Sequence, residues 1–260
     1  MNRLGESISA VPCRASKNFD QPDAIDALEA RIVVLASGTG SNFQALAEWA
    51  ARFGERSDKE SVRRAGECAR ARIAALVSDK LNALVLARAE KMGIPAVCKR
   101  FAATAGASET IKKAARRAYD AELADIVQSF RPDFIFLLGW MRLLSSEFLS
   151  RFPGKVVNLH PALPGQFPGT HAIERAFSAF RQGKISNSGV MTHFVPDEGI
   201  DSGPTIAVEK VAIFPSDDLD SFEKRIHETE HSLVAATAAL LIARRHQEGG
   251  FPPETTKKEE

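Results

Sequence analysis

The residues best suited to chemistry lie in one stretch, Asn158 to Gly169, which reads NLHPALPGQFPG. Asn158 and His160 follow an apolar run and are two residues apart, so in a strand their side chains point to the same face. Pro161 cannot extend the strand pairing, so we expect the strand to end there. An imidazole exchanges a proton near neutral pH, and an amide can donate to a developing oxyanion. The pattern predicts a polar site at the carboxyl end of a strand, where open α/β sheets bind ligands. The alternative is a purely structural, hydrogen-bonded His.

An acidic turn, Asp197 to Pro204 (DEGIDSGP), joins two later strands. A carboxylate beside an imidazole favours the imidazolium and raises its pKa. If Asp201 reaches His160, we therefore expect His160 to act as a proton donor or electrostatic stabiliser near pH 7. Taken alone, the turn is better explained as a solvated connection, because acidic turns are common.

A glycine-rich loop, Ser37 to Asn42 (SGTGSN), lies between a buried strand and a helix. Such a loop presents backbone N–H groups to an anion, with the positive end of the helix dipole behind them. Phe43 stands where a dinucleotide fingerprint needs its third Gly, and no Gly-Lys-Ser/Thr follows, so this is neither a Rossmann fingerprint nor a P-loop. The loop indicates a site for one phosphate monoester, and a plain tight turn is the alternative.

Two histidine patterns could hold a metal ion. His227 to His231 reads H-x-x-E-H on a helix, and His160, His193 and Asp201 could form two imidazoles and a carboxylate. The first pattern lacks a third protein ligand, and the second leaves Asn158 without a role. We therefore expect no metal, and we interpret His193 as a buried hydrogen-bonded residue.

The hydrophobic periodicity predicts strands that alternate with helices, hence an α/β fold with a Rossmann-like, doubly wound, mostly parallel sheet in a single domain. The strands are expected at 31–36, 73–77, 94–98, 133–139, 155–159, 187–195 and 205–213, and the last two follow each other without a helix and are expected to pair antiparallel. The helices are expected at 43–53, 82–92, 108–130, 170–182 and 216–244, with Ser216 as the last N-cap, and a short helix is expected after Ser145 or Ser146. We expect a flexible extension at 1–29, one folded domain at 30–246, a charged surface insertion at 54–71 and a polar tail at 247–260.

The composition is that of an ordinary globular protein. Of 260 residues 44% are hydrophobic and 26% charged, and the net charge of +1 gives no reason to expect bulk attraction to nucleic acid or to an anionic membrane. No apolar run approaches the ~20 residues of a membrane span, and the first residues lack the apolar core of a secretory signal. The three cysteines are odd in number and lack metal-ligand spacing, so we expect reduced thiols in a cytoplasmic protein.

Four stretches, read together and in this order, resemble the phosphoribosylglycinamide formyltransferase family, the folate-dependent enzymes of purine biosynthesis. They are Ile32–Asn42, Leu138–Leu144, Asn158–Gly169 and Val190–Pro204, and the resemblance covers about residues 31–244. It implies formyl transfer from 10-formyltetrahydrofolate to the amine of 5-phosphoribosylglycinamide. It also implies small-molecule substrates, no metal, no nucleic acid or membrane partner, and a monomer or homodimer.

The resemblance assigns roles to individual residues. Asn158, His160 and Asp201 match the family's catalytic trio. Gly40, Ser41, Asn42 and Glu230 match the binding site of the glycinamide nucleotide, which gives the His227–His231 run a better explanation than zinc. The residues that match the folate site are Arg116, Trp140, Met141, Arg142, Leu143, Asn158, Pro196, Asp197 and Asp201.

Other readings remain open at this point. A related formyl-folate enzyme could release formate by hydrolysis or act on a sugar amine or on methionyl-tRNA. We expect an additional amino-terminal domain in the hydrolase and a basic carboxyl-terminal domain in the tRNA enzyme, and residues 1–29 and 247–260 are too short for either. A non-catalytic phosphate-binding module would use the glycine-rich loop alone. Such a module does not require Asn158, His160 and Asp201 to converge.

Overall fold

The computed structural model describes residues 29–55, 70–102 and 106–248. Its centre is a seven-stranded sheet with the strand order β3-β2-β1-β4-β5-β6-β7. The strands are β1 (Glu29–Leu35), β2 (Arg70–Ser78), β3 (Ala96–Cys98), β4 (Phe134–Leu137), β5 (Val156–His160), β6 (Asn187–Phe194) and β7 (Thr205–Ala212). The helices are α1 (Ser41–Glu55), α3 (Leu84–Lys91), α4 (Glu109–Ser129), α5 (Ser146–Leu149), α6 (Ala172–Arg181) and α7 (Leu219–Glu248).

The strand pairing changes direction along the sheet. Strands β3, β2, β1, β4 and β5 are parallel, whereas β6 pairs antiparallel with both β5 and β7. The chain order reverses between β1 and β4, which lie side by side at the middle of the parallel part. In open α/β sheets, the loops that leave the carboxyl ends of the strands at such a switch point diverge and form the ligand crevice.

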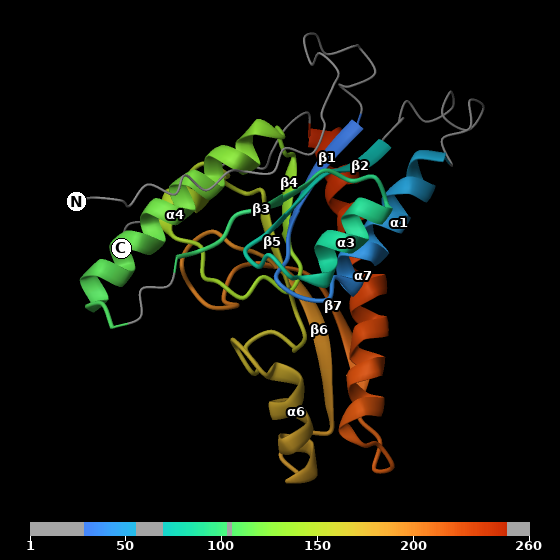
Figure 1. Cartoon of the computed structure of the whole chain (residues 1–260). Helices are drawn as coiled ribbons and strands as arrows, with labels where there is room; N and C mark the ends of the chain where they lie inside the picture. The colour runs from blue at the N-terminus through green and yellow to red at the C-terminus, as the bar shows by residue number, and fades with distance from the viewer. Residues whose placement is uncertain (1–28, 56–69, 103–105, 249–260) are drawn as a thin grey trace.

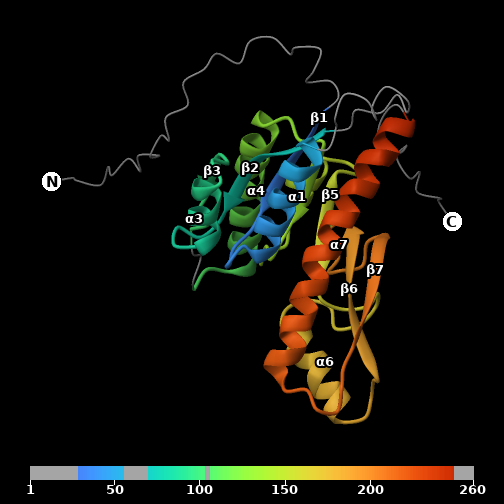
Figure 2. The same ribbon diagram turned by 90° about the vertical axis from the view of Figure 1, so that its right-hand side faces the viewer.

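Alternate residues of the central strands build two hydrophobic cores, one on each face of the sheet. In β1, Ile32 and Val34 belong to the core under α1 and α7, and Val33 and Leu35 belong to the core under α4. All four side chains are fully buried, as expected for a strand covered on both faces. Figures 1 and 2 show α4 on one face of the sheet and α1, α3 and the long α7 on the other.

The predicted fold class is confirmed, and each predicted strand and helix has a counterpart, including the antiparallel β6–β7 pair. The extension at 1–29 except its last residue, residues 56–69 of the insertion and 249–260 of the tail lie outside the described residues. None of the helices in the described ranges is both long and apolar enough to cross a membrane.

Two helix starts differ from the sequence prediction. Ser216 is not the N-cap of α7. Instead Asp218 and Ser221 cap the helix reciprocally: the Asp218 carboxylate accepts from the Ser221 N–H at 2.9 Å, and Ser221 Oγ accepts from the Asp218 N–H at 3.1 Å. Ser145 does precede α5, but its hydroxyl makes no capping bond.

Candidate active site

The predicted site residues lie at the carboxyl ends of the parallel strands. The loop after β1 begins at Ser37, the loop after β4 begins at Gly139, and β5 ends at His160. The first two loops are joined at the switch point, where the Ser37 N–H donates to the Gly139 carbonyl at 3.2 Å and the Met141 N–H donates to Ser37 Oγ at 3.4 Å. The sheet topology therefore places these three loops along one edge.

Asp201 is the centre of a polar cluster with Asn158 and His160. Its Oδ2 lies 3.3 Å from His160 Nδ1, and its Oδ1 accepts from Asn158 Nδ2 at 2.9 Å. The backbone N–H of Gly169 donates to the same Oδ2 at 2.7 Å. Asp201 has a φ of 49°, a left-handed conformation that Asp tolerates better than most residues. The structure thus brings together the three side chains that the sequence analysis singled out.

His193 also belongs to this cluster, although the sequence analysis gave it only a structural role. It is buried, and its Nε2 lies 3.2 Å from Asn158 Nδ2 and 3.5 Å from Asp201 Oδ1. Its Nδ1 lies 2.8 Å from the carbonyl of Phe194. The missed signal was the strand register, because Asn158 and His193 are directly opposite each other in the β5–β6 pair.

Each ring nitrogen of His160 faces an oxygen atom. Nδ1 faces Asp201, and Nε2 lies 3.1 Å from the carbonyl of Phe167, so only the imidazolium can donate to both. Burial opposes that charge and has the largest effect: the pKa of His160 lies below its ordinary value of 6.5, although Asp201 raises it. The expectation that Asp201 holds His160 charged near pH 7 was therefore wrong, because desolvation outweighs the nearby carboxylate.

Asp201 itself remains ionised. Burial pushes its pKa upward, but hydrogen bonds from His193 and from the Gly169 N–H, together with the charge of His160, bring the pKa below its ordinary value of 3.8. The Asn158 amide group is already engaged, because Nδ2 donates to Asp201 and faces His193. To stabilise an oxyanion, as predicted, Asn158 must redirect one of these two hydrogens.

A second polar cluster joins the start of α1 to α7. Asn42 Nδ2 donates to Glu230 Oε2 at 3.0 Å, and His227 Nδ1 lies 2.7 Å from the same oxygen. Glu230 is buried, and the hydrogen bond to Glu230 is the main reason why the pKa of His227 is raised. Gly40, directly before α1, has a φ of 80°, and a Cβ there would lie 2.4 Å from Val85, so the tight turn requires Gly.

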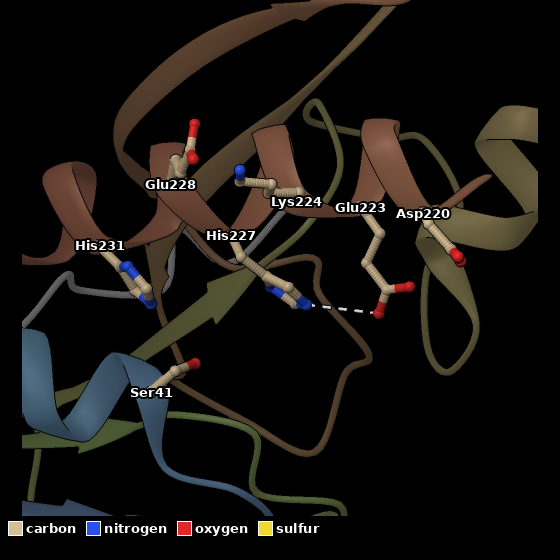
Figure 3. A pocket seen from close by; sticks show the side chains of 7 residues that line it. All are labelled: Ser41, Asp220, Glu223, Lys224, His227, Glu228 and His231. Carbon is tan, nitrogen blue, oxygen red and sulfur yellow. Dashed lines mark hydrogen bonds and ion pairs between the residues drawn. The ribbon is translucent and has the colours of Figure 1, made fainter. Parts of the chain in front are cut away.

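This cluster borders a hollow of about 450 Å³. Figure 3 shows His227 and His231 reaching from α7 toward Ser41 at the first turn of α1. The other lining residues are Asp220, Glu223, Lys224 and Glu228, all from α7. The first N–H groups of a helix have no partner within the helix, so the start of α1 offers donors to an anion in this hollow.

The residues matched to the folate site are spread over three segments. Arg116 of α4 forms an ion pair with Glu198, whose other oxygen accepts from the Ser146 N–H at 3.1 Å. The guanidinium of Arg142 lies 3.7 Å from the ring centroid of Phe101.

The other residues of this set differ in exposure. Trp140 is buried, whereas Met141 and Leu143 are 64% and 44% exposed. Pro196 and Asp197 lie on the exposed turn that precedes Asp201. The residues matched to the folate site thus include exposed apolar side chains after β4 and an exposed turn before Asp201.

Comparison with known proteins identifies the family. The model of a family described as "Formyl transferase" matches residues 30–238, most of the chain. The chain belongs to the formyl transferase family. Within that family, a phosphoribosylglycinamide formyltransferase of Schizosaccharomyces pombe is 38% identical over 216 residues, which cover 82% of this chain and 97% of the relative. The Escherichia coli protein of the same name is 34% identical over 205 residues, covering 78% and 82%.

Solved structures of the family share the fold. The glycinamide ribonucleotide transformylase 1 of Symbiobacterium toebii superposes with a TM-score of 0.67 at 29% identity, covering 88% of this chain and 94% of that one. The corresponding Geobacillus kaustophilus protein gives 0.63 at 34% identity, covering 82% and 98%. The resemblance recognised in the sequence is therefore confirmed for the family and for the fold.

The sequence offered two candidate metal sites, His227–His231 and the set of His160, His193 and Asp201. In the parts of the chain that the structure describes, no group of three His, Cys, Asp or Glu side chains is arranged to hold a metal ion. His160, His193 and Asp201 do meet, but Asp201 lies between the two rings and bonds to both Asn158 and Gly169. Cys98 is a free thiol, and Cys13 and Cys68 lie outside the described residues.

Proposed function

We propose that this protein transfers the formyl group of 10-formyltetrahydrofolate to the amine of 5-phosphoribosylglycinamide, a step of de novo purine biosynthesis. The observation that supports this most directly is the meeting of Asn158, His160 and Asp201 at the end of β5. The substrate amine forms a bond to the formyl carbon, and the bond from that carbon to N10 of the folate breaks. One proton must leave the amine, and one must reach N10.

We assign the transfer of that proton to His160. Because burial lowers the pKa of His160, the ring is neutral before the reaction and can accept the proton of the attacking amine. The imidazolium then formed donates from Nδ1 to Asp201 and shares its Nε2–H between the Phe167 carbonyl and the reacting substrate. His160 next delivers the proton toward N10, directly or through water.

We assign the tetrahedral oxyanion to Asn158 and to the newly formed imidazolium. A donor aimed at such an oxyanion is typically worth about 3 kcal/mol of the activation barrier in a site that excludes water. Asn158 Nδ2 also contacts His193. When one Nδ2 hydrogen turns to the oxyanion, this contact keeps the amide group oriented. The pre-organised position of both substrates supplies much of the remaining acceleration.

The glycinamide nucleotide is proposed to bind in the hollow between α1 and α7. Its phosphate binds to the turn at Gly40, Ser41 and Asn42, where the first N–H groups of α1 point. Glu230, held by Asn42 and His227, offers a carboxylate to the glycinamide amine or to the ribose hydroxyls. The raised pKa of His227 gives a cation that offsets the negative charge of Glu230 close to a bound phosphate.

The folate is proposed to lie across the loops after β4 and before Asp201. The pterin ring packs on the segment from Trp140 to Leu143 and is covered by the turn with Pro196 and Asp197. Arg116 interacts with the anionic tail of the folate, in exchange for or beside its ion pair with Glu198. No step of this proposal requires a metal ion.

The decisive experiment compares acceptors. Purified protein is incubated with 10-formyltetrahydrofolate and, in separate reactions, with 5-phosphoribosylglycinamide, a sugar amine or no acceptor. We expect tetrahydrofolate and formylated nucleotide to appear in equal amounts with the first acceptor only. Formate release without an acceptor, or formylation of the sugar amine alone, would replace this proposal by the hydrolase or by the sugar-amine enzyme. The absence of turnover in every reaction would favour the binding module.

A further inference from the structure

One exposed side chain, Arg175 of α6, donates hydrogen bonds to the 167–171 loop. This loop contacts two members of the catalytic trio, His160 and Asp201. Arg175 Nη2 donates to the carbonyl of Phe167 at 2.6 Å and to the carbonyl of Pro168 at 2.7 Å. Its Nε donates to the carbonyl of His171 at 3.3 Å. One guanidinium therefore connects three carbonyls on both sides of Gly169.

This loop has an unfavourable backbone conformation. Phe167, Gly169 and His171 have φ values of 45°, 79° and 58°. Only Gly adopts positive φ without a steric penalty, so Phe167 and His171 need surrounding contacts to hold them there. Both of these residues offer their carbonyls to Arg175, which places the hydrogen bonds where the backbone is least stable by itself.

The same loop makes both backbone contacts to the trio. The Phe167 carbonyl that accepts from Arg175 is also the oxygen 3.1 Å from His160 Nε2. The Gly169 N–H, one residue after the Pro168 carbonyl, donates to Asp201 at 2.7 Å. Movement of the loop by 1 Å changes both contacts at once.

We propose that Arg175 is a positioning residue for formyl transfer: it fixes the 167–171 loop so that Phe167 and Gly169 hold His160 and Asp201 in their reactive arrangement. Arg175 acts through the loop and touches no reacting atom. The effect on turnover rests on the proposed function, whereas the effect on the loop does not. A planar guanidinium suits this task because it presents several donors in a fixed fork, which a lysine ammonium cannot reproduce.

The test compares Arg175→Met, Arg175→Lys and Arg181→Met. Methionine keeps a long apolar stem without donors, and Arg181 is a second exposed arginine on α6 that serves as the matched control. For Arg175→Met we expect kcat to fall about 10- to 100-fold, since a 1 Å misplacement can cost that much, with KM for each substrate within about threefold. Arg175→Lys should recover part of kcat, and Arg181→Met should match the wild type.

Two further measurements separate positioning from a general loss of structure. The Phe167 carbonyl raises the pKa of His160, so in Arg175→Met, where the loop no longer holds this carbonyl in place, the acid limb of the kcat/KM profile should move to lower pH. Exchange of the Gly169 amide hydrogen, followed by NMR without substrates, should be about tenfold faster, while amides of the buried β1 keep wild-type rates.

The outcomes are distinguishable. If kcat and Gly169 exchange of Arg175→Met both stay within twofold of the wild type, the inference is overturned. A loss of kcat with unchanged Gly169 exchange also overturns it, because Arg175 would then act on substrate directly. If the wild type has no formyl transfer activity, the proposed function fails, and Gly169 exchange alone still decides whether Arg175 fixes the loop.

Discussion

Asn158 and His193 face each other across the antiparallel pair of β5 and β6, with Asn158 Nδ2 3.2 Å from His193 Nε2. The same Asn158 Nδ2 donates to Asp201, which also lies 3.5 Å from His193. A fourth side chain therefore sets the orientation of the amide and the ionisation of the carboxylate. This relationship places His193 within the proposed active site.

His193→Phe should move the acid limb of the pH profile. His193 lowers the pKa of His160, so its removal raises that pKa, and the base His160 becomes protonated at a higher pH. We expect the acid limb of kcat/KM, which reports the free enzyme, to shift upward, and we expect kcat at the plateau to fall about tenfold. His193→Gln, which can still form a hydrogen bond to Asn158, should restore part of kcat but not the acid limb. An unchanged acid limb in His193→Phe would remove His193 from the site.

Arg116→Gln tests whether Arg116 binds the anionic tail of the folate. If the guanidinium binds the anionic tail of the folate, KM for 10-formyltetrahydrofolate should rise about tenfold with little change in kcat, because the contact is remote from the reacting atoms. Arg117→Gln is the matched control, since Arg117 is the next residue on α4 and forms an exposed ion pair with Glu147. Equal effects of the two substitutions would show that Arg116 has no special contact with the folate.

His227→Gln should change stability in a pH-dependent way. The pKa of His227 in the folded protein is raised above its ordinary value of 6.5, mainly by Glu230. Its stabilising contribution is therefore fully present below about pH 6.5 and is lost as the pH rises through the folded-state pKa. Because the side chain is 42% exposed, solvent screening keeps the contribution below about 1 kcal/mol.

Denaturant unfolding at pH 5.5 and pH 9 measures this difference between wild type and variant. His171→Gln is the control, because His171 and Glu174 have the same i,i+3 spacing but the His171 side chain is 75% exposed. We expect a larger loss of stability at pH 5.5 for His227→Gln than for His171→Gln, and none at pH 9 for either. A loss of equal size at both pH values would argue against a charged His227–Glu230 pair.

Gly40→Ala should destabilise the glycine-rich turn, and Gly38→Ala should not. A Cβ on Gly40 would meet Val85 at 2.4 Å at a φ of 80°, whereas a Cβ on Gly38 would have nothing within 4 Å. We expect a loss of about 1 to 3 kcal/mol of unfolding free energy for Gly40→Ala and a change within about 0.5 kcal/mol for Gly38→Ala. Chemical denaturation of the two variants checks this, and equal effects would contradict the account of the turn.

The parts of this structure that depend on local pattern could be predicted from the sequence. The buried alternation of β1 and the end of β5 before Pro161 follow from side-chain period and from proline geometry. The capping of α7 was missed because Ser216, Asp218 and Ser221 are all plausible capping residues, and only the backbone path selects Asp218. Local sequence thus predicts that a helix or strand exists more reliably than it predicts the residue at which the element begins.

The parts that depend on long-range pairing could not be predicted. Asn158 and His160 could be paired from their spacing, but the place of His193 required the β5–β6 register. The lowered pKa of His160 required the extent of its burial, which one sequence does not reveal. The role of Arg175 required the path of the 167–171 loop, whose positive φ values fall on residues that rarely adopt them.

The most direct test of the central claim is the turnover of Asp201→Asn with 10-formyltetrahydrofolate and 5-phosphoribosylglycinamide, measured in a single-turnover experiment. The substitution keeps the size of the side chain but removes the charge that stabilises the His160 imidazolium. The account predicts a chemical step slower by about 10² to 10⁴, with the wild-type circular dichroism spectrum retained. A folded Asp201→Asn protein whose rate stays within twofold of the wild type would contradict it.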